Sequence, residues 1–333
     1  HEGNLFLFLI NHTYKIMVVV VLENLKKNYN YSEQFLRRIE KSMSEHFKSY
    51  NGRVSVGLMG SFGRMEASEC SDLDYFIIFF DNEENLKSCY KTFEEKFKKD
   101  NPNMKISLIH QCEKETLLKN IGGLDDTSKS LTTRVLLLLE SKCLFNQALY
   151  NEVLNSLHTI YLEEFLREEK FPLFFTNEII RFWRTLCIDY RYKRSGANKP
   201  WGLRNIKLRF SRKFDIFLAL YFTILLYKKE LNSKEFKDLL NAPIISKIQK
   251  LNDKLENEEL KTLFFEIYSI YDSFIENVNE EDVRKELESI KFEERNSSKK
   301  YIELKEKAMQ FHKKLIKMIQ KTAPNILEHY FII

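Results

Sequence analysis

The sequence is poor in the residues that interrupt regular structure. It contains only 9 glycines and 5 prolines in 333 residues. A collagen-like chain, a low-complexity disordered chain and a turn-rich β-sandwich are therefore excluded, and a helix-rich protein is expected. Four of the nine glycines nevertheless fall within twelve residues, at Gly52, Gly57, Gly60 and Gly63. This clustering indicates a special backbone conformation in that stretch.

The sequence also lacks the signatures of several other classes. Its 5 cysteines form no C-x-x-C pair, and their wide spacing in a chain of 40.0 kDa does not suit a disulfide framework. The apolar runs 5–10, 16–22 and 216–226 are shorter than the roughly 20 residues that span a bilayer. We therefore expect a cytoplasmic protein with no membrane span and no signal peptide. Whether the residues before Met17 are native is left open.

Charge is nearly balanced, with 53 Lys and Arg against 48 Asp and Glu, a net charge of +5. This mild excess alone says little about partners. With 44% hydrophobic residues, a chain of this length can bury a substantial core, and its length favours two domains.

Hydrophobic spacing predicts the order of elements in the first half of the chain. Apolar residues at intervals of four, from Phe35 to Phe47, predict an amphipathic helix within 23–50. Alternating or continuous apolar runs predict strands at 54–58, 72–80 and 105–110, and a helix is expected at 83–98.

Beyond Gly122 and Gly123 the pattern is helical. Candidate helices are 131–144, 151–169, 177–193, 203–229, 233–240 and 281–319. We therefore expect an α+β fold with three parts: an N-terminal segment and helix at 1–50, a small mixed-sheet core at 51–145, and an α-helical domain at 146–333.

The chemistry is concentrated in residues 54–80, VSVGLMGSFGRMEASECSDLDYFIIFF. Gly60 and Gly63 are expected to let the backbone approach phosphate oxygens. Ser61 offers a hydroxyl and an N–H at a helix start. Asp72 and Asp74 alternate along a strand and so share one face. Two such carboxylates suit Mg²⁺ beside substrate phosphates, and two ions could activate an attacking hydroxyl and neutralise departing pyrophosphate.

Gly60-Ser61, followed by Asp72-Leu73-Asp74 between two strands, resembles the signature of the DNA polymerase β-like nucleotidyltransferase superfamily. Within it, GSFGR…E…SDLD looks most like bacterial signalling and protein-modifying nucleotidyltransferases. The resemblance implies transfer of a nucleoside monophosphate from an NTP to an acceptor with release of pyrophosphate. It also implies that Gly60 and Ser61 hold the triphosphate and that Asp72 and Asp74 bind Mg²⁺, which Mn²⁺ could replace. No P-loop or dinucleotide fingerprint competes with this interpretation.

The superfamily usually adds a third carboxylate on a later strand of the core. The expected strand at 105–110 contains no acid. Glu113, just beyond its end, and Asp125, after the Gly-Gly turn, are equal candidates. A site with two carboxylates, or one assisted by His110, is the alternative, and without a third acid the activity itself is in question.

A second feature is an acid-free basic stretch between Asp189 and Asp215, which carries nine Lys and Arg residues. Such a surface could hold triphosphate or a nucleic-acid backbone, or it could be a solvated face that balances the acidic C-terminal third. The candidate nucleotide-binding residues outside the Gly-Ser turn are Arg64, Arg181, Arg184, Lys199 and Arg204.

The acceptor is left open among several classes. A nucleotide or oligonucleotide acceptor would give a signal in bacterial antiviral defence, which the basic stretch favours. A protein side chain would make the chain an AMPylating-type transferase or toxin, for which heptad-like patches in the C-terminal helices offer a partner surface. A small molecule such as an antibiotic is a third acceptor. A catalytically silent nucleotide-binding or nucleic-acid-binding subunit is the alternative from another class.

Overall fold

The computed structural model describes residues 22–80, 86–192 and 201–331. The chain divides into two compact units. Unit 1 contains the described residues of His1–Lys27, Tyr190–Phe217 and Ile245–Glu328, and unit 2 contains those of Asn28–Asp189, Leu218–Ile244 and His329–Ile333. The domain limits expected from the sequence, at 50 and 145, stay a prediction.

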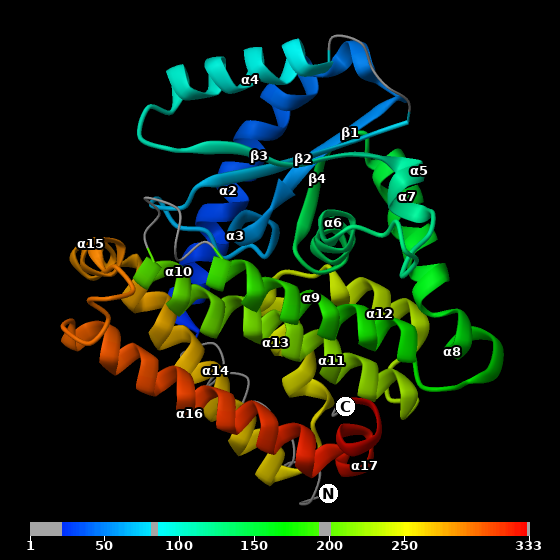
Figure 1. Cartoon of the computed structure of the whole chain (residues 1–333), viewed down its shortest axis with the longest axis vertical. Helices are drawn as coiled ribbons and strands as arrows, with labels where there is room; N and C mark the ends of the chain where they lie inside the picture. Colours follow the sequence, from blue (N-terminus) through cyan, green and yellow to red (C-terminus); the bar gives the residue numbers. More distant parts are fainter. Residues whose placement is uncertain (1–21, 81–85, 193–200, 332–333) are drawn as a thin grey trace, which may run out of the picture. The chain divides into compact units, whose positions relative to one another are not determined.

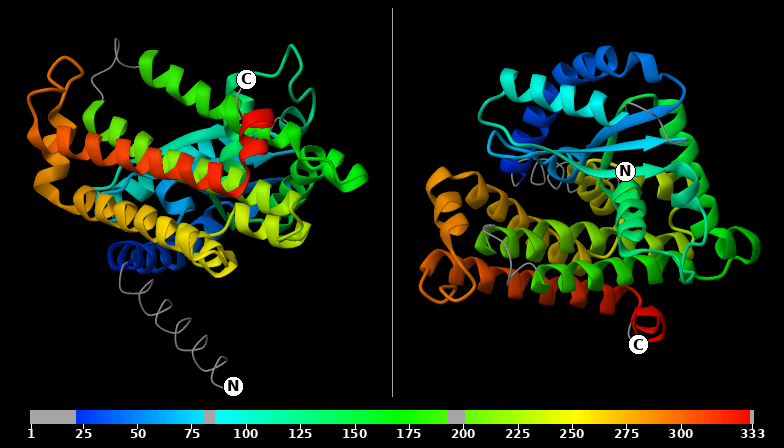
Figure 2. Two further views of the ribbon diagram at one scale, coloured as in Figure 1. Left: turned by 90° about the horizontal axis from the view of Figure 1, so that it is seen from below. Right: turned by 45° about the horizontal axis from the view of Figure 1, so that its top comes forward.

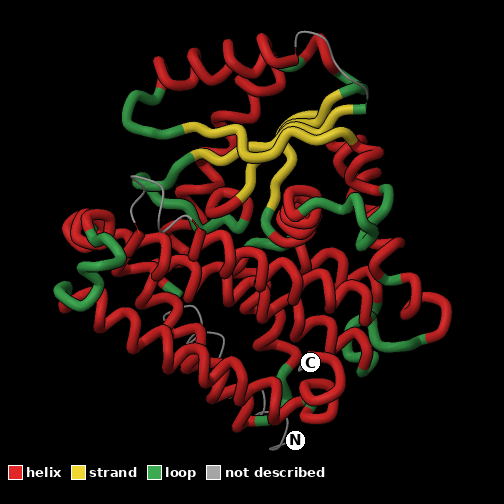
Figure 3. The backbone as a smooth tube through the Cα atoms, in the orientation of Figure 1, coloured by secondary structure: helices red, strands yellow, loops and turns green. Residues whose placement is uncertain are grey.

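Unit 2 is built on a mixed sheet of four strands within the described residues. The strands are β1 (Val54–Met59), β2 (Leu73–Phe79), β3 (Ile106–Glu113) and β4 (Ser141–Phe145), in the order β3-β2-β1-β4 (Figure 3). β1 is antiparallel to both β2 and β4, whereas β2 and β3 are parallel. The expected α+β class with a mixed sheet is thereby confirmed.

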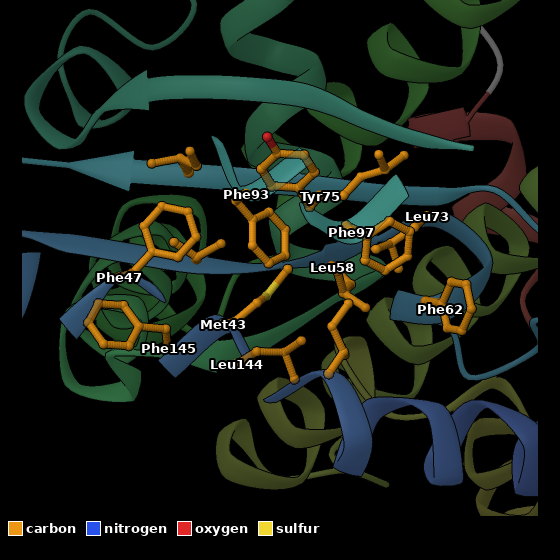
Figure 4. Packing of buried hydrophobic residues seen from close by; sticks show 14 of the residues in the cluster. Met43, Phe47, Leu58, Phe62, Leu73, Tyr75, Phe93, Phe97, Leu144 and Phe145 are labelled. Atoms are coloured by element: carbon orange, nitrogen blue, oxygen red, sulfur yellow. The ribbon is translucent and has the colours of Figure 1, made fainter. Parts of the chain in front are cut away.

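One face of the sheet packs on α2 (Glu23–His46) and α4 (Leu86–Asp100). The part of α2 from Asn28 onward belongs to unit 2. The apolar residues of α2 that predicted a helix are buried in this cluster, as are Phe93 and Phe97 of α4. Figure 4 shows Met43 of α2 and Phe47, which directly follows α2, in this cluster with Phe93, whose ring centroid lies 5.7 Å from that of Phe47. Apolar residues on both faces of β2 explain why its sequence is a continuous hydrophobic run.

The other helices of unit 2 include α6 (Ser128–Leu139) and α7 (Gln147–Tyr161), and the ring of Phe76 in β2 stacks on that of Tyr150 in α7 at 6.0 Å. Further helices of this unit are α3 (Gly60–Gly63), α5 (Lys114–Leu118), α8 (Glu163–Glu168), most of α9 (Leu173–Tyr192), the part of α11 (Lys213–Tyr227) from Leu218 onward, and α12 (Ser233–Leu240), labelled in Figure 1.

The regular elements in the described part of unit 1 are all helices. It comprises α10 (Trp201–Lys207), a π-helix (Leu208–Arg212), the start of α11 (Lys213–Tyr227), α13 (Ile244–Lys254, from Ile245), α14 (Glu258–Asn279), α15 (Glu281–Ser289), α16 (Lys299–Thr322) and α17 (Pro324–Ile326). Helices α14 and α16 run side by side (Figure 2). Phe210 stacks on Phe274 with a centroid distance of 4.5 Å, and Lys247 and Asp215 form a buried ion pair at 2.5 Å.

Three expected helices are wrong in part. The end of the expected helix 131–144 is strand β4, because α6 ends before Glu140 and Ser141–Phe145 pairs with β1. The expected helix 203–229 contains the π-helix, and 281–319 is broken between α15 and α16. Among the described helices, none is both long and apolar enough to span a membrane.

Candidate functional site

The candidate site begins where β1 ends. Met59 is extended, and Gly60 follows with φ +70°, a left-handed conformation that favours glycine. A Cβ atom on Gly60 would lie 3.3 Å from Oδ2 of Asp74. The absence of a side chain at Gly60 therefore keeps the backbone of the Gly-Ser turn directly beside this carboxylate.

Asp72 lies directly before β2, and Asp74 is the second residue of that strand, paired with Met59 in the β1–β2 ladder. Asp72 is exposed and Asp74 is half-buried. A turn closed by the Ser71 backbone N–H and the Ser68 carbonyl at 2.9 Å leads into this strand. The structure thus brings Gly60, Ser61 and Asp74 together, and Asp72 lies two residues before Asp74, just ahead of the strand.

Asp72 and Asp74 offer carboxylate oxygens, which are ligands of the kind that a divalent cation such as Mg²⁺ needs. No group of three or more His, Cys, Asp or Glu residues that could hold a metal occurs in the described ranges. The two carboxylates beside a backbone cradle still suit Mg²⁺, which keeps several waters and usually takes one or two carboxylates together with substrate phosphates. The residues present therefore fit a magnesium ion that binds together with its nucleotide.

The short helix after the turn has a smaller role than the sequence suggested. α3 covers only Gly60–Gly63, so its dipole is small. Gly63 is required for packing, because a Cβ atom there would lie 1.9 Å from the carbonyl oxygen of Glu140, and its expected role in phosphate approach stays a prediction. Gly57 is required similarly for strand packing, since its Cβ would lie 2.6 Å from the ring of Phe76.

Arg64 is placed differently from the expectation that it binds triphosphate. Its side chain is 6% exposed. Its Nε donates to Oε1 of Glu66 at 2.8 Å, and its guanidinium also pairs with Glu140. Met65, with φ +59°, reverses the chain between Arg64 and Glu66 so that the two side chains meet. Two buried carboxylates therefore already compensate the charge of Arg64, and we interpret it as a residue that fixes the loop.

The loop between the turn and β2 is also anchored by α2. Asn28 donates from Nδ2 to the carbonyl of Glu66 at 3.0 Å, and the Ala67 N–H donates to Oγ of Ser32 at 3.0 Å. Sequence reasoning missed Asn28, Ser32, Glu66 and Glu140. The spacing of Arg64 and Glu66 was a usable signal for one pair, whereas nothing in the sequence links Glu140 to the turn.

The structure does not bring Glu113 to the aspartates. β2 and β3 are parallel, and the residue opposite Asp74 is Ser107, whereas Glu113 lies opposite Phe79 at the other end. Six residues of strand separate Ser107 from Glu113, which is about 20 Å. Glu113 and Asp125 instead line one pocket of about 500 Å³, so neither supplies a third carboxylate at this end of the sheet.

His110 does not assist the aspartates either. It lies in β3, where its Nδ1 is 2.7 Å from Oγ1 of Thr133 in α6. Burial, with a smaller contribution from Lys129, lowers the pKa of His110 to about 4. A buried neutral histidine hydrogen-bonded to a threonine is a structural residue.

The predicted phosphate-binding arginines have different surroundings. Arg181 of α9 donates to Oδ2 of Asp126 at 3.0 Å and to Oε1 of Glu178 at 3.1 Å. Asp126 also receives a bidentate pair of hydrogen bonds from buried Arg134, at 2.9 and 2.7 Å. Arg181 thus belongs to an ionic cluster that holds α9 to α6, which argues against a role in nucleotide binding.

Arg184, one turn further along α9, is exposed. Arg204 belongs to unit 1, where its guanidinium lies over the ring of Tyr190 at 4.9 Å. Lys199 lies outside the described residues. The nucleotide-binding roles of Arg184, Lys199 and Arg204 stay predictions.

Comparison with known families agrees with the placement of this site. Residues 21–119 match the family described as "Putative nucleotidyltransferase DUF294". The match includes the Gly-Ser turn and both aspartates, and it is consistent with a polymerase β-like nucleotidyltransferase, which confirms the resemblance at that level. It supports nucleotidyl transfer as the general activity. No curated protein matches the chain significantly.

Proposed function

We propose that the chain is a Mg²⁺-dependent nucleotidyltransferase that transfers a nucleoside monophosphate from an NTP to an acceptor hydroxyl and releases pyrophosphate. The observation that carries the proposal is the contact between Gly60 and Asp74. A left-handed glycine lies at the end of a buried strand, and its missing side chain leaves backbone groups within reach of a carboxylate. This juxtaposition suits a ligand that presents both phosphate oxygens and a cation.

Each residue of the site has a distinct task in the proposed reaction. The backbone at Gly60 and Ser61, with the Ser61 hydroxyl, holds the triphosphate through N–H and O–H donors. Asp72 and Asp74 would hold the cation. When bound, Mg²⁺ (or Mn²⁺) supplies charge neutralisation of the phosphates and acidifies the acceptor hydroxyl. The buried pairs of Arg64 with Glu66 and Glu140 keep the turn and the strand in register.

The favoured acceptor is a nucleotide or an oligonucleotide, which would give a signal molecule in bacterial defence. The support for this class is the basic stretch between Asp189 and Asp215. Two other acceptors are kept as alternatives. A protein side chain would make the chain an AMPylating-type transferase or toxin with a partner at its C-terminal helices. The other acceptor is a small molecule such as an antibiotic. A cytoplasmic location is part of the same proposal.

The test compares Asp72→Asn and Asp74→Asn, alone and together, with Asp100→Asn, an exposed aspartate at the end of α4. All three replacements keep the shape of the side chain and remove one charge. Pyrophosphate release is measured with each NTP and Mg²⁺. We expect the two site variants to lose at least about a hundredfold in turnover, since metal binding contributes several kcal/mol to such reactions. Full turnover in the double variant would overturn the proposal.

A catalytically silent nucleotide sensor is the second candidate, and one observation favours it. The β3 residue opposite Asp74 is Ser107, so the neighbouring strand places no third carboxylate there. Incubation of the unmodified protein with labelled NTPs and Mg²⁺ separates the candidates. Oligomeric or cyclic products support a nucleotide acceptor, self-labelling supports a protein acceptor, and tight NTP binding without turnover supports the sensor.

A further inference from the structure

Unit 1 carries a face on which arginines are held by neutral groups. Arg209 donates from Nε to Oδ1 of Asn205 at 2.8 Å. Arg295 lies over the ring of Phe292 at 4.0 Å and donates to the Phe292 carbonyl at 2.7 Å. Within the described part of the chain, neither guanidinium has an acidic partner. Both are therefore fixed in position while their charge remains uncompensated.

Two titratable groups of α16 report on the surroundings of these arginines. Burial raises the pKa of Tyr301, and Arg209 and Arg295 oppose that shift. Burial lowers the pKa of His312, and Lys213 and Arg209 lower it further. The charged groups that act on the two pKa values are all cations. Arg209, Lys213 and Arg295 thus create a positive potential along one side of α16.

The sequence of α16 separates this side from the opposite one. Lys305, Met309 and His312 follow one another at intervals of four and three and so share a face. On the other side, Lys307, Lys314 and Lys321 recur every seven residues and pair with Glu303, Glu266 and Glu259. Lys314 and Lys321 pair with α14 and Lys307 pairs within its own helix, so all three are neutralised within the fold. The first face, at positions 305, 309 and 312, contains no acidic residue.

We propose that the face formed by Arg209, Lys213, Arg295, Lys305 and His312, here called the cationic face, binds the phosphate backbone of nucleic acid. Lys305 and His312 are about 10 Å apart along the helix axis. This span matches about three successive phosphates of one strand, and a single phosphate would not use it. Arginines already fixed by neutral partners can bind phosphate without losing an ion pair. Binding at this face does not depend on the proposed transfer reaction.

The experiment measures binding of a fluorescent single-stranded RNA of about 15 nucleotides to the full chain without NTP, by anisotropy, over a range of salt concentrations. The test variant carries Arg209→Gln, Lys213→Gln and Arg295→Gln. The matched control carries Lys307→Gln, Lys314→Gln and Lys321→Gln, which removes the same charge from the opposite side of α16. We expect the test variant to bind at least about tenfold more weakly and the slope of log K against log salt to fall by about 2.

A second pair of variants keeps the test valid if the triple variant does not fold. Met309 is 49% exposed, so Met309→Glu adds a negative charge to the cationic face without removing a buried contact. Gln310→Glu adds the same charge one residue away, on a different side of the helix. Weaker RNA binding by the first variant alone supports the proposal.

Equal RNA binding by Met309→Glu and Gln310→Glu, or equal losses in the two triple variants, would overturn it, because net charge alone would then explain the effect. Binding to vesicles of phosphatidylserine in place of RNA would identify a membrane surface instead. A DNA oligonucleotide and an RNA duplex, measured under the same conditions, show which form of the backbone is preferred. Because no NTP is present, a negative result leaves the proposed transferase activity untouched.

Discussion

Among single residues, Gly60 offers the sharpest test of the candidate site. Gly60→Ala would place a Cβ atom 3.3 Å from Oδ2 of Asp74 in a left-handed conformation that costs about 1–2 kcal/mol for other residues. Gly52→Ala is the matched control, since Gly52 has φ +82° and a Cβ atom there would meet nothing within 4 Å. We expect both variants to lose similar stability in urea unfolding, and only Gly60→Ala to lose pyrophosphate release. Comparable activity losses in the two variants would mean that backbone strain, and not the site, is responsible.

Arg64 is predicted to act through stability. It is buried against Glu66 and Glu140, and removal of one partner from a buried ionic group costs about 3–5 kcal/mol. Arg64→Met should therefore lower the free energy of unfolding by roughly that amount, as measured by urea denaturation. Arg37→Met, at an exposed arginine paired with Glu33 on α2, should change it by less than about 1 kcal/mol. A stable Arg64→Met protein with a raised KM for NTP would restore the role in triphosphate binding.

The part of the site that could be predicted from sequence lies within one short segment. Gly60, Ser61, Asp72 and Asp74 are linked by two strands whose patterns are unambiguous, so their proximity follows from local structure. The pairing of Arg64 with Glu140 joins residues far apart in the chain and depends on α6 ending next to α3. The position of Glu113 could not be predicted, because the parallel pairing of β2 with β3 decides which strand end meets Asp74.

Among the elements, the helices with a clear apolar stripe were predictable and the short edge strand β4 was not. The stripe of α2 and the run in β2 each bury the residues that their spacing indicated. The sequence before and through β4, LLLLESKCLF, continues the leucine-rich pattern of α6, so its spacing does not mark the change. β4 forms because β1 offers it an unpaired edge, which is a tertiary effect.

Two buried histidines should make the elements around the sheet sensitive to acid. His110 in β3 has its pKa lowered to about 4, and His158 in α7 has its pKa lowered to about 3, chiefly by burial, with Lys237 adding to the latter. An unfolded chain protonates histidine near pH 6.5. Between about pH 6.5 and these lower values the unfolded state binds more protons, so the free energy of unfolding should decrease as pH falls.

The slope is about 1.4 kcal/mol per pH unit for each histidine in that window. Urea unfolding between about pH 6.5 and about pH 4.5 measures it. His110→Gln and His158→Gln should each flatten the dependence, whereas His329→Gln should not. An unchanged slope in both core variants would show that these rings are not buried as neutral groups.

For the whole molecule, the division into two units predicts how the chain unfolds. The chain passes between the units after Lys27, Asp189, Phe217, Ile244 and Glu328. Each of these points falls inside a helix, namely α2, α9, α11, α13 and a short π-helix at Leu327–Phe331. Each of these helices therefore contributes residues to both units. Because helix formation is cooperative, unfolding of one unit would remove hydrogen-bonded turns from helices that are shared with the other unit. We therefore expect the chain to unfold in a single transition.

The two tryptophans allow this to be measured, since Trp183 lies in unit 2 and Trp201 in unit 1. Trp183→Phe leaves a probe of unit 1, where Trp201 packs against Phe292 with a centroid distance of 5.2 Å, and Trp201→Phe leaves a probe of unit 2. In urea, the fluorescence transition of each variant should coincide with its own transition in far-ultraviolet circular dichroism. A fluorescence midpoint separated from the helical signal in either variant would show that the units unfold independently. The helices that cross between the units would then have to break at those five points, and the two units could be studied as separate domains.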